Sequence, residues 1–548
     1  MSSKTTSGSS GFLKQGSILA AASILVRIIG MLYRIPMANT IGDEGNGIYS
    51  AAFEIYNILL IISSYGMPMA VSKMVSAQLT YDRHKQAYWI FRCAMVFSVI
   101  SGGLCSLLVF FGADWLEQHF FHSYYGVAIP LRVLAPTIFV VAVMGTIRGL
   151  FQGLKTMMPT ALSQIIEQIV NAFVSVFMAW YLMSSHRDSA KVAAWGAAGG
   201  TLGTCLGAVS ALLLLLFICA MYAPVVDRKN RHDHYGIQMS VGQTYKLIFA
   251  TVIPIILSQT VYQLSGIVDV TMINVILSKK GIAGSLISTW QGIYSTKYRL
   301  LVSVPIAVST AIASSMIPSL VSSYVNRDRK QIHQKVNLAI KFNMIIAFPS
   351  AVGLAVVARP IIQVLFPSAD SQMGSRMMIL GSTCIIFYAL STVTSGVLQS
   401  IDRMSLPVWH SLISLIVHVI LVAVLMAATN MGVYALVVGN VTYPMLVCYL
   451  NGRSVSRALK FKQEIRQTFA IPLVASLVMG GLTYGTFTLL HSLLHSNIIA
   501  LLPALLVAVG SYFTLVLRMG SLSRQELYEF PMGRRMSILA DKLHLLKD

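Results

Sequence analysis

Residues 192–222 read VAAWGAAGGTLGTCLGAVSALLLLLFICAMY and contain no Asp, Glu, Lys or Arg. A helix of about 20 apolar residues crosses the hydrocarbon core of a bilayer, so this stretch is long enough to span a membrane. The rest of the chain has the same character, because 56% of its 548 residues are hydrophobic, 11% are charged and its mean hydropathy is +0.72. Soluble proteins carry about 25% charged residues. The sequence therefore predicts an all-α, multi-pass membrane protein.

The same length criterion, applied along the whole chain, predicts fourteen membrane spans. They are 12–40, 46–80, 85–112, 123–152, 157–184, 191–222, 240–277, 285–325, 331–357, 372–400, 405–428, 431–452, 465–492 and 496–518. Several exceed a single crossing, which indicates tilted helices or helices that extend beyond the bilayer.

The positive charges predict how the chain is oriented. Lys and Arg number 40 against 19 Asp and Glu, which gives a net charge of +21. If the N-terminus is cytoplasmic, most of the basic residues between the spans fall on the inside. Because cytoplasmic loops of membrane proteins carry the excess of Lys and Arg, both termini are expected inside the cell. The bilayer then accounts for the basic character, and no nucleic-acid partner is expected.

Several other functions are disfavoured. The six cysteines are scattered through apolar stretches without a CxxC pair, so neither a metal site nor a disulfide is expected. No GxxxxGK[ST] sequence is present, so the chain is not expected to hydrolyse ATP by that route. The first apolar run contains Arg27 and Arg34, which is unlike a cleaved signal peptide. No enzymatic activity and no cofactor are predicted.

Short matches between the two halves indicate an internal repeat. Pro68–Ser72 (PMAVS) resembles Pro305–Ser309 (PIAVS), and Gly149–Gln152 (GLFQ) resembles Gly396–Gln399 (GVLQ). Six helices per repeat is an even number, so both halves have the same topology, with a pseudo-two-fold axis along the membrane normal and a cavity between them. The predicted domains are a cytoplasmic N-terminus (1–11), an N-lobe (12–222), a cytoplasmic linker (223–239), a C-lobe (240–452), two extra helices (465–518) and a cytoplasmic tail (519–548).

Charges inside the spans are the most informative residues, because a charge at the bilayer centre costs several kcal/mol unless it meets water, a partner or a substrate. Basic residues near span ends, such as Arg132, Arg148 and Lys341, are expected to be structural residues that can reach the interface with their long side chains. Seven charges lie deeper, namely Arg27, Arg34, Lys297, Arg299, Glu54, Glu167 and Asp269.

Four of these cations predict a binding site for an anion. Arg27 and Arg34 are seven residues apart and share one helix face, about 10 Å apart along the axis. Gly30 lies between them and leaves room for a bulky group. The planar guanidinium suits diphosphate oxygens. Lys297 and Arg299 occupy the opposite repeat, so the two pairs would form two cationic walls of one cavity.

The alternative is a set of internal ion pairs. Glu54 is predicted at about the depth of Arg34, and Asp269 near Lys297 and Arg299. Either arrangement would satisfy the buried charges, although intramembrane charges are more often functional.

Gln164, Glu167, Gln168 and Asn171 form a polar stripe on one face of span 157–184. The stripe could line the cavity with Gln164 and Glu167, or it could bond to the preceding helix near Arg148, since polar residues often join membrane helices. Asp269 and His418 are candidate sites for a coupling sodium ion or proton. A lone histidine in a membrane helix can equally be a packing residue.

The segments that contain these residues resemble a known family. They are Arg27–Pro36, Ile41–Gly45, Ser64–Pro68, Arg148–Gly153 and Ser163–Gln168. The chain is similar to the polysaccharide-transporter branch of the multidrug/oligosaccharidyl-lipid/polysaccharide exporter superfamily, in particular to its stage V sporulation protein B and peptidoglycan lipid II flippase group. The resemblance covers roughly residues 12–518.

The resemblance implies a flippase of the bacterial plasma membrane. Two six-helix lobes would work by alternating access and move an undecaprenyl-diphosphate-linked sugar, lipid II or a related precursor, from the inner to the outer leaflet. Arg27, Arg34 and Arg299 would hold the diphosphate, and the two extra helices would form a groove for the polyprenyl tail. A sodium or proton gradient or the membrane potential would drive the cycle. The implied roles are cell-wall biogenesis, peptidoglycan and polysaccharide biosynthesis and cell shape, alongside envelope-synthesis proteins.

Two departures leave the particular lipid open. The two arginines stand one residue further apart than in lipid II flippases, and Ile61 and Ile62 stand where those proteins have a further arginine. Rival interpretations are a cation-coupled drug exporter, a membrane glycan enzyme and a non-transporting component of envelope synthesis.

Overall fold

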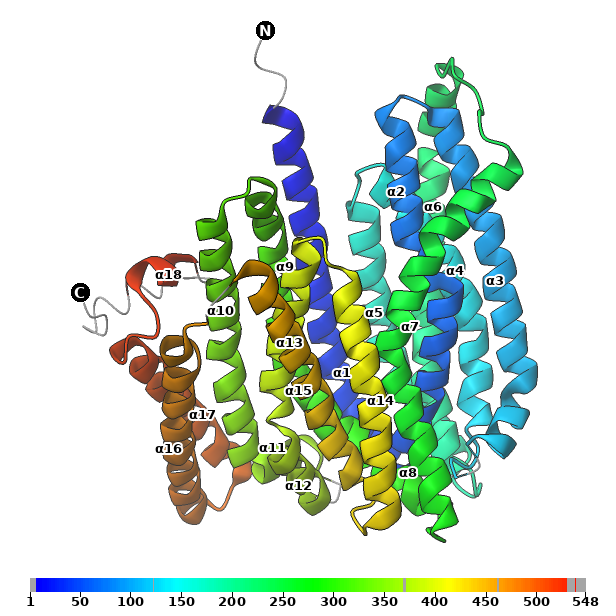
Figure 1. The fold of residues 1–548 in the computed structure, drawn as a ribbon. Coiled ribbons are helices and arrows are strands. Elements are labelled where there is room, and N and C mark those ends of the chain that lie inside the picture. Colours follow the sequence, from blue (N-terminus) through cyan, green and yellow to red (C-terminus); the bar gives the residue numbers. More distant parts are fainter. Residues whose placement is uncertain (1–5, 122, 368–370, 461–462, 530–537, 539–548) are drawn as a thin grey trace. The chain divides into compact units, whose positions relative to one another are not determined.

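A computed structural model describes residues 6–121, 123–367, 371–460, 463–529 and 538 (Figure 1). The helices are α1 (Thr6–Leu60), η1 (Ile61–Tyr65), α2 (Met67–Thr80), α3 (His84–His119), α4 (Ala128–Gly153), α5 (Met158–Ser185), α6 (Val192–Arg231), α7 (Val241–Lys279), α8 (Gly284–Ile293), η2 (Tyr294–Arg299), α9 (Leu300–Val325), α10 (Arg329–Val356), α11 (Ala358–Leu365), α12 (Ser371–Gly381), α13 (Cys384–Ser400), α14 (Ser405–Ala428), α15 (Tyr434–Leu459), η3 (Arg466–Ala470), α16 (Ile471–Leu494), α17 (Asn497–Arg518) and α18 (Arg524–Glu529). The predicted all-α membrane class is confirmed.

Ten helices of the described residues are long and apolar enough to cross a membrane, or eleven if the bent pair α12–α13 forms one span. The predicted number of fourteen spans is therefore not confirmed, although nearly every predicted range coincides with a helix. One reason is that the ranges 12–40 and 46–80 are joined through α1, η1 and α2 and count as a single span.

The first helix reverses direction at Gly42, whose φ of 69° and ψ of 179° lie outside the helical region. Glycine has no Cβ and adopts this backbone at low cost. The Asn46 side chain donates hydrogen bonds to the carbonyls of Ala38 (2.9 Å) and Gly42 (2.6 Å) beside this break. Gly47 then lets α8 approach closely, since a Cβ there would lie 1.9 Å from the Ser288 carbonyl oxygen.

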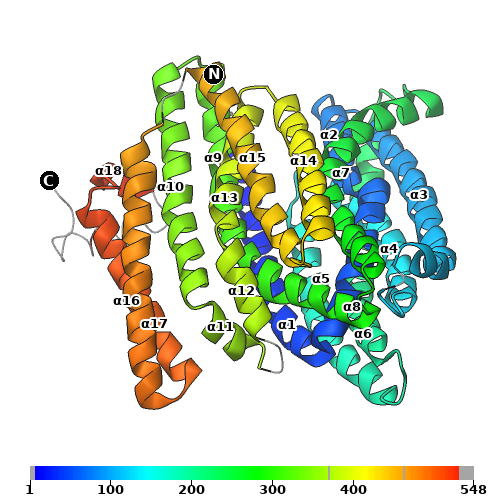
Figure 2. The same cartoon turned by 60° about the horizontal axis from the view of Figure 1, so that its bottom comes forward.

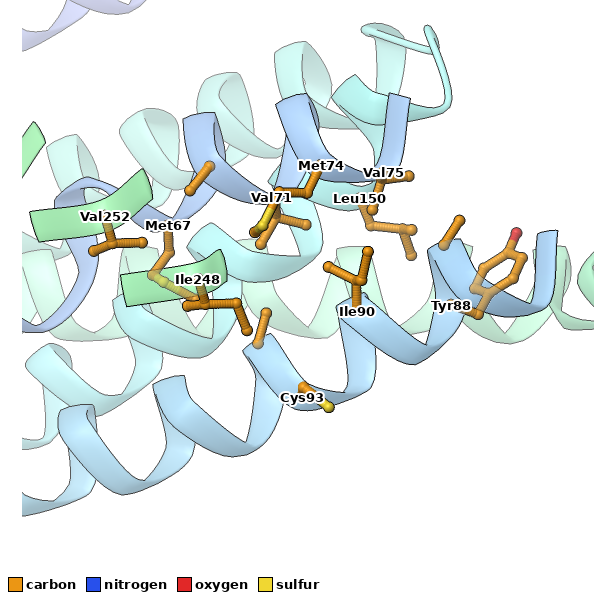
Figure 3. Close-up of a cluster of buried hydrophobic side chains, with 13 residues drawn as sticks. Met67, Val71, Met74, Val75, Tyr88, Ile90, Cys93, Leu150, Ile248 and Val252 are labelled. Atoms are coloured by element: carbon orange, nitrogen blue, oxygen red, sulfur yellow. The ribbon is translucent and has the colours of Figure 1, made fainter. Parts of the chain in front are cut away.

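The described chain divides into two compact units, Met1–Gly292 and Ile293–Asp548. Helix α7 packs within the first unit, where Ile248 and Val252 join a buried cluster with Met67, Val71 and Ile90 (Figure 3). The predicted lobe boundary lies earlier, at the linker 223–239. That boundary was derived from the repeat, whereas the compact units reflect packing, and the domain bounds stay a prediction.

The linker between α6 and α7 is fastened to the start of α3. The Asp233 carboxylate accepts the Lys85 backbone N–H at 2.6 Å, and the Gln86 side chain accepts the N–H groups of Gln238 and Met239 at 2.8 and 3.0 Å. Burial alone raises the pKa of Asp233. Backbone N–H groups, above all that of Lys85, and the Lys85 charge outweigh this effect and hold the pKa below its ordinary value of 3.8. The carboxylate is therefore a stabilising anion at neutral pH.

In the second unit, α16 and α17 lie side by side (Figure 1 and Figure 2) and share a buried core with α10. Tyr512 of α17 donates a hydrogen bond to the Ile345 carbonyl at 2.8 Å. Leu522 and Leu527, which follow α17, are 3% and 0% exposed and belong to the same core. The segment after the last long helix is thus an integral part of this unit.

Four helix-ending turns, two in each unit, share one geometry. Asp82 and Lys155 in the first unit, and Arg327 and Asp402 in the second, have φ values of 55°, 61°, 56° and 60°. In each turn this residue bonds to the carbonyl three positions back, and the next residue bonds to the carbonyl five positions back. The same helix-capping geometry thus ends α2 and α4 in one unit and α9 and α13 in the other.

Candidate functional site

Arg34 is partly buried in the first unit and faces aromatic rings. Its Cζ atom lies 4.8 Å from the centroid of Tyr49 and 5.9 Å from that of Phe53. A straight helix would separate Arg34 and Tyr49 by about 22 Å, so the reversal at Gly42 creates this contact. Cation–π contacts of this kind contribute about 0.5–2 kcal/mol.

The guanidinium of Arg34 keeps hydrogen-bonding capacity. Among the described residues its buried Nε atom has no hydrogen-bond partner, and no ion pair to it is found in that part of the chain. The alternative of an Arg34–Glu54 ion pair is therefore not supported. The Glu54 carboxylate lies instead against α7, where a Cβ on Gly266 would come within 2.3 Å of its Oε2 atom.

The helix face between Arg27 and Arg34 meets the polar stripe of α5. A Cβ on Gly30 would lie 3.1 Å from Nε2 of Gln168, and the Asn171 amide donates a hydrogen bond to the Tyr33 hydroxyl at 3.1 Å. Arg27 itself is exposed. Tyr33 could not be predicted from the sequence, because nothing in its neighbourhood marks it as the partner of an asparagine more than a hundred residues later.

Glu167 bonds to α4. Its Oε2 atom lies 2.7 Å from a guanidinium nitrogen of Arg148, whose Nε also donates to the Ser163 hydroxyl at 3.0 Å. Arg148 is thus a structural residue, and for Glu167 the alternative of a bond to the preceding helix is the one observed. Gln164, one turn earlier, has a buried Oε1 atom without a partner among the described residues. Within the polar stripe, Glu167 therefore joins α5 to α4, whereas Gln164 keeps an acceptor atom without a partner among the described residues.

Asp269 of α7 is 8% exposed and lies one helical turn after Gly266, the residue that contacts Glu54. Neither carboxylate is without a partner. His418 of α14 is 3% exposed, packs against Gly439 and makes an edge contact with Tyr443 at 6.0 Å. No group of three metal-ligating residues occurs in the described residues.

In the second unit, Lys297 and Arg299 lie on a π-helical turn, η2, which the sequence did not predict. Lys297 is fully buried with its stem against Gly374, and Arg299 is exposed. The two cations therefore point in different directions, and neither lacks a partner. π-Helical turns are frequent at functional sites. The η2 turn is fixed by Tyr298, whose hydroxyl donates to the Gly381 carbonyl at 3.2 Å.

An apolar groove of about 670 Å³ lies between α9, α10, α11, α16 and α17. Its walls include Val304, Pro305, Pro349, Gly353, Met479, Leu505, Val509 and Phe513. The two last long helices of the chain thus build one side of a groove that suits a hydrocarbon chain.

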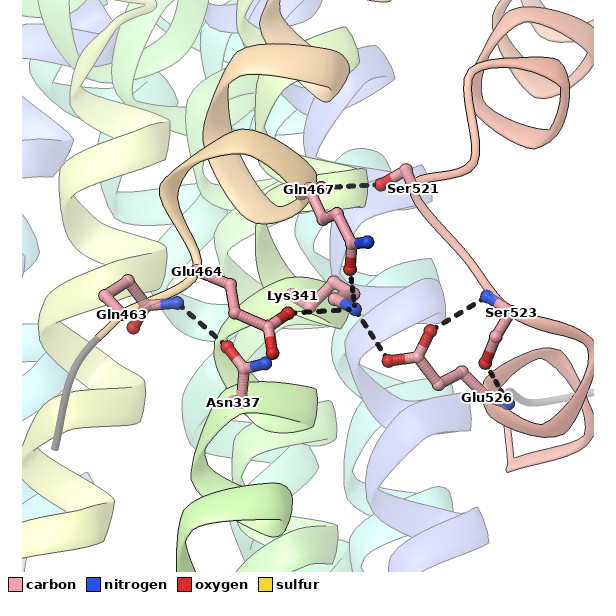
Figure 4. Close-up of polar contacts among 8 residues, drawn as sticks. All are labelled: Asn337, Lys341, Gln463, Glu464, Gln467, Ser521, Ser523 and Glu526. Carbon is pink, nitrogen blue, oxygen red and sulfur yellow. Dashed lines mark hydrogen bonds and ion pairs between the residues drawn. The ribbon is translucent and has the colours of Figure 1, made fainter.

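Lys341 of α10 is the buried centre of an ion cluster (Figure 4). Its ammonium is 2.6 Å from Glu526, 3.2 Å from Gln467 and 3.6 Å from Glu464, and its side chain is 2% exposed. These contacts agree with the expectation that Lys341 is a structural residue, and they identify its partners. The sequence could not show these partners, because Glu526 is 185 residues away.

These features define a multi-pass membrane protein with deep cations and an apolar groove. A family model described as "Polysaccharide biosynthesis protein" matches residues 12–324, more than half of the chain, and a second, "MatE", matches residues 254–424. The chain belongs to the polysaccharide biosynthesis protein family, and the predicted resemblance is confirmed.

Two relatives from Bacillus subtilis (strain 168) cover most of the chain. "Stage V sporulation protein B" is 23% identical over 533 residues, 96% of this chain and 99% of that protein. "Lipid II flippase MurJ" is 23% identical over 430 residues, 75% of this chain and 77% of that protein. The solved structure "Lipid II flippase MurJ, inward closed conformation" matches with a TM-score of 0.66 at 16% identity, covering 91% of this chain and 97% of that one. This likeness establishes the fold.

Proposed function

We propose that this protein is a flippase that moves an undecaprenyl-diphosphate-linked sugar, lipid II or a related precursor, from the inner to the outer leaflet. The observation that carries the proposal is Arg34, a partly buried guanidinium that stacks on aromatic rings and has no ion pair in the described part of the chain. A cation in this state attracts an anionic ligand, and a guanidinium matches phosphate oxygens. The names of the flippase relatives point the same way.

Each part of the substrate finds a counterpart. Arg27 and Arg34, on one face of α1, would hold the diphosphate together with the exposed Arg299. Lys297 is fully buried and already has a partner, so it would act by supporting the η2 turn. Gln164 supplies an acceptor for sugar hydroxyls. The groove beside α16 and α17 takes the polyprenyl tail, because its walls are almost wholly apolar.

An energy source is needed to release the anion. One elementary charge moved through 100 mV is worth about 2.3 kcal/mol, and an inside-negative potential favours outward movement of an anion. Coupling to sodium or a proton at Asp269 or His418 is the alternative drive. In this proposal the protein works in the bacterial plasma membrane with both termini cytoplasmic, beside envelope-synthesis proteins, and catalyses no covalent reaction.

A second candidate is cation-coupled export of drugs. The match of residues 254–424 to the "MatE" model favours it, and that stretch holds the buried Asp269. An exporter of cationic drugs would depend on the acids rather than on Arg34.

The test is a flipping assay in proteoliposomes with a labelled undecaprenyl-diphosphate sugar. Arg34→Gln and Arg27→Gln should each lower the rate by about ten-fold or more, because one charge-assisted hydrogen bond is worth about 1.5–3 kcal/mol. Arg132→Gln is the matched control, since Arg132 pairs with Asp114 near a helix end. Unchanged rates in both α1 variants would defeat the proposal, and loss of transport only in Asp269→Asn would favour drug export.

A further inference from the structure

A second cavity, of about 550 Å³, lies in the second unit between the α9–α10 turn and the end of α15. Arg327 and Arg329 line it from the turn, and Lys460 lines it from the residue that ends α15. The two walls are joined by a 2.8 Å hydrogen bond between Nε2 of His333 and the Leu459 carbonyl. Three cations and His333 thus line one cavity, whose two walls are joined by a hydrogen bond.

The described residues that line this cavity include no acid. Asp328, the acid nearest in sequence, already caps α10 by accepting the Gln331 N–H at 3.0 Å. Arg327, Arg329 and Lys460 are exposed, so water and salt weaken their mutual repulsion, and an anion that enters the cavity lowers it further. The cavity is therefore suited to a negatively charged ligand.

In the first unit, the α2–α3 turn corresponds to the α9–α10 turn and is in contact with an acidic side chain. There the α2–α3 turn has the same hydrogen-bond pattern as the α9–α10 turn, and the chain itself supplies the anion. The Asp233 carboxylate from the linker accepts the backbone N–H of Lys85 in the first turn of α3, and the Asp233 carbonyl accepts the Lys85 ammonium at 3.0 Å. No such segment of the described chain lines the cavity at the second turn.

The rim of the cavity is apolar. Tyr324 and Val325, the last residues of α9, are 40% and 72% exposed and also line the cavity. A ligand that satisfies both parts has a phosphate and hydrocarbon chains. We infer that this cavity binds the phosphate of an anionic phospholipid of the leaflet that faces the α9–α10 turn. Basic side chains at a membrane surface attract anionic lipids.

The test is native mass spectrometry of the full-length protein titrated with phosphatidylglycerol, with phosphatidylcholine as the zwitterionic comparison. The pocket variant is Arg327→Asn/Arg329→Gln, since asparagine tolerates the positive φ of position 327. Phosphatidylglycerol should bind this variant about ten-fold more weakly, which corresponds to about 1.4 kcal/mol. Lys460→Asn, which removes the third cation from another helix, should also weaken binding, so the result does not depend on the folding of one variant.

The matched control is Arg228→Gln/Lys229→Gln, which removes two exposed charges from the last turn of α6 and should leave phosphatidylglycerol binding unchanged. Equal weakening in the control and the pocket variant would mean diffuse surface attraction and would overturn the inference, as would unchanged binding in the pocket variants. Displacement of the lipid by millimolar inorganic phosphate would assign the cavity to a soluble phosphate instead. The inference is independent of the flippase proposal, because Arg34 variants should bind phosphatidylglycerol normally.

Discussion

Two deep cations, Arg34 and Lys341, have opposite surroundings. Lys341 is neutralised by Glu526 and Glu464, whereas Arg34 faces two aromatic rings and has no ion pair in the described part of the chain. A buried charge that is already paired gains little from a ligand, and breaking such a pair is costly. Lys341 is therefore a structural residue, and Arg34 is the residue with capacity to bind substrate.

Removing the Lys341 ammonium should destabilise the second unit. Lys341→Met leaves Glu526 beside an apolar side chain, and we expect a loss of about 3 kcal/mol in the free energy of unfolding. The double variant Lys341→Met/Glu526→Gln should recover part of this loss, which a double-mutant cycle on thermal unfolding in detergent would measure.

The control for this cycle lies on the same helix. Lys335 donates hydrogen bonds to the Ser319 carbonyl and the Ser323 hydroxyl at 2.9 and 2.8 Å, so Lys335→Met should cost about 1 kcal/mol or less. Equal losses for Lys335→Met and Lys341→Met, with no coupling to Glu526, would contradict the assigned role of the cluster.

At the scale of helices, hydropathy predicted most of the structure. The range 405–428 coincides with α14, because a long uncharged run has few alternatives to a membrane helix. The reversal at Gly42 fell in the predicted gap between two spans. The π-helical turn at Lys297 was not predictable, since it arises from packing rather than from a composition signal.

The candidate site was predictable in part for the same reason. The cost of charge in a membrane singled out Arg27, Arg34 and Lys297 from the sequence, without any knowledge of their neighbours. The partners of Arg148 and Lys341 were not predictable, because a contact between distant helices leaves no local signal.

Gly42 allows a further prediction about α1. Gly42→Ala should destabilise the first unit by about 1–3 kcal/mol, because its φ and ψ belong to a region that is essentially restricted to glycine. No atom lies within 4 Å of the Cβ that alanine would add, so the cost is conformational rather than steric. Thermal unfolding would measure it.

Gly112→Ala is the matched control, because Gly112 lies within α3 and its added Cβ would also meet open space. Alanine favours a helix by about 1 kcal/mol over glycine, so this variant should be neutral or more stable. A Gly42→Ala protein as stable as the Gly112→Ala protein would show that the reversal does not need glycine.

Across the fold as a whole, the linker between α6 and α7 fastens the start of α7 to the first unit. Asp233, Gln86 and Lys85 hold the linker to α3, and α7 packs on the first unit. Any rearrangement that detached α7 from this unit would have to break these contacts. The two units repeat the same capped turns but complete them differently, one with Asp233 and the other with a cavity.

Asp233→Asn should loosen this linker in a pH-dependent way. The native pKa of Asp233 lies below 3.8, so its contribution to stability is present above pH 3.8 and is lost as the pH falls through the native value. The wild-type protein should therefore unfold at a higher temperature than the variant at pH 7, and the difference should disappear at lower pH. Asp227→Asn, at an exposed position of α6, is the control. A difference between wild type and Asp233→Asn that persists unchanged to pH 3 would contradict the assignment.

The fold of the C-terminal segment has a practical consequence for anyone who engineers this protein. Deleting everything after α17 to shorten an expression clone would strip two leucines from a packed interior and leave the Lys341 ammonium without its 2.6 Å carboxylate partner. If such a truncated protein showed no transport, the cause would be its damaged fold, and the result would say nothing about the transport mechanism. Affinity tags belong at the far end of the tail, beyond Glu529, or at the other terminus.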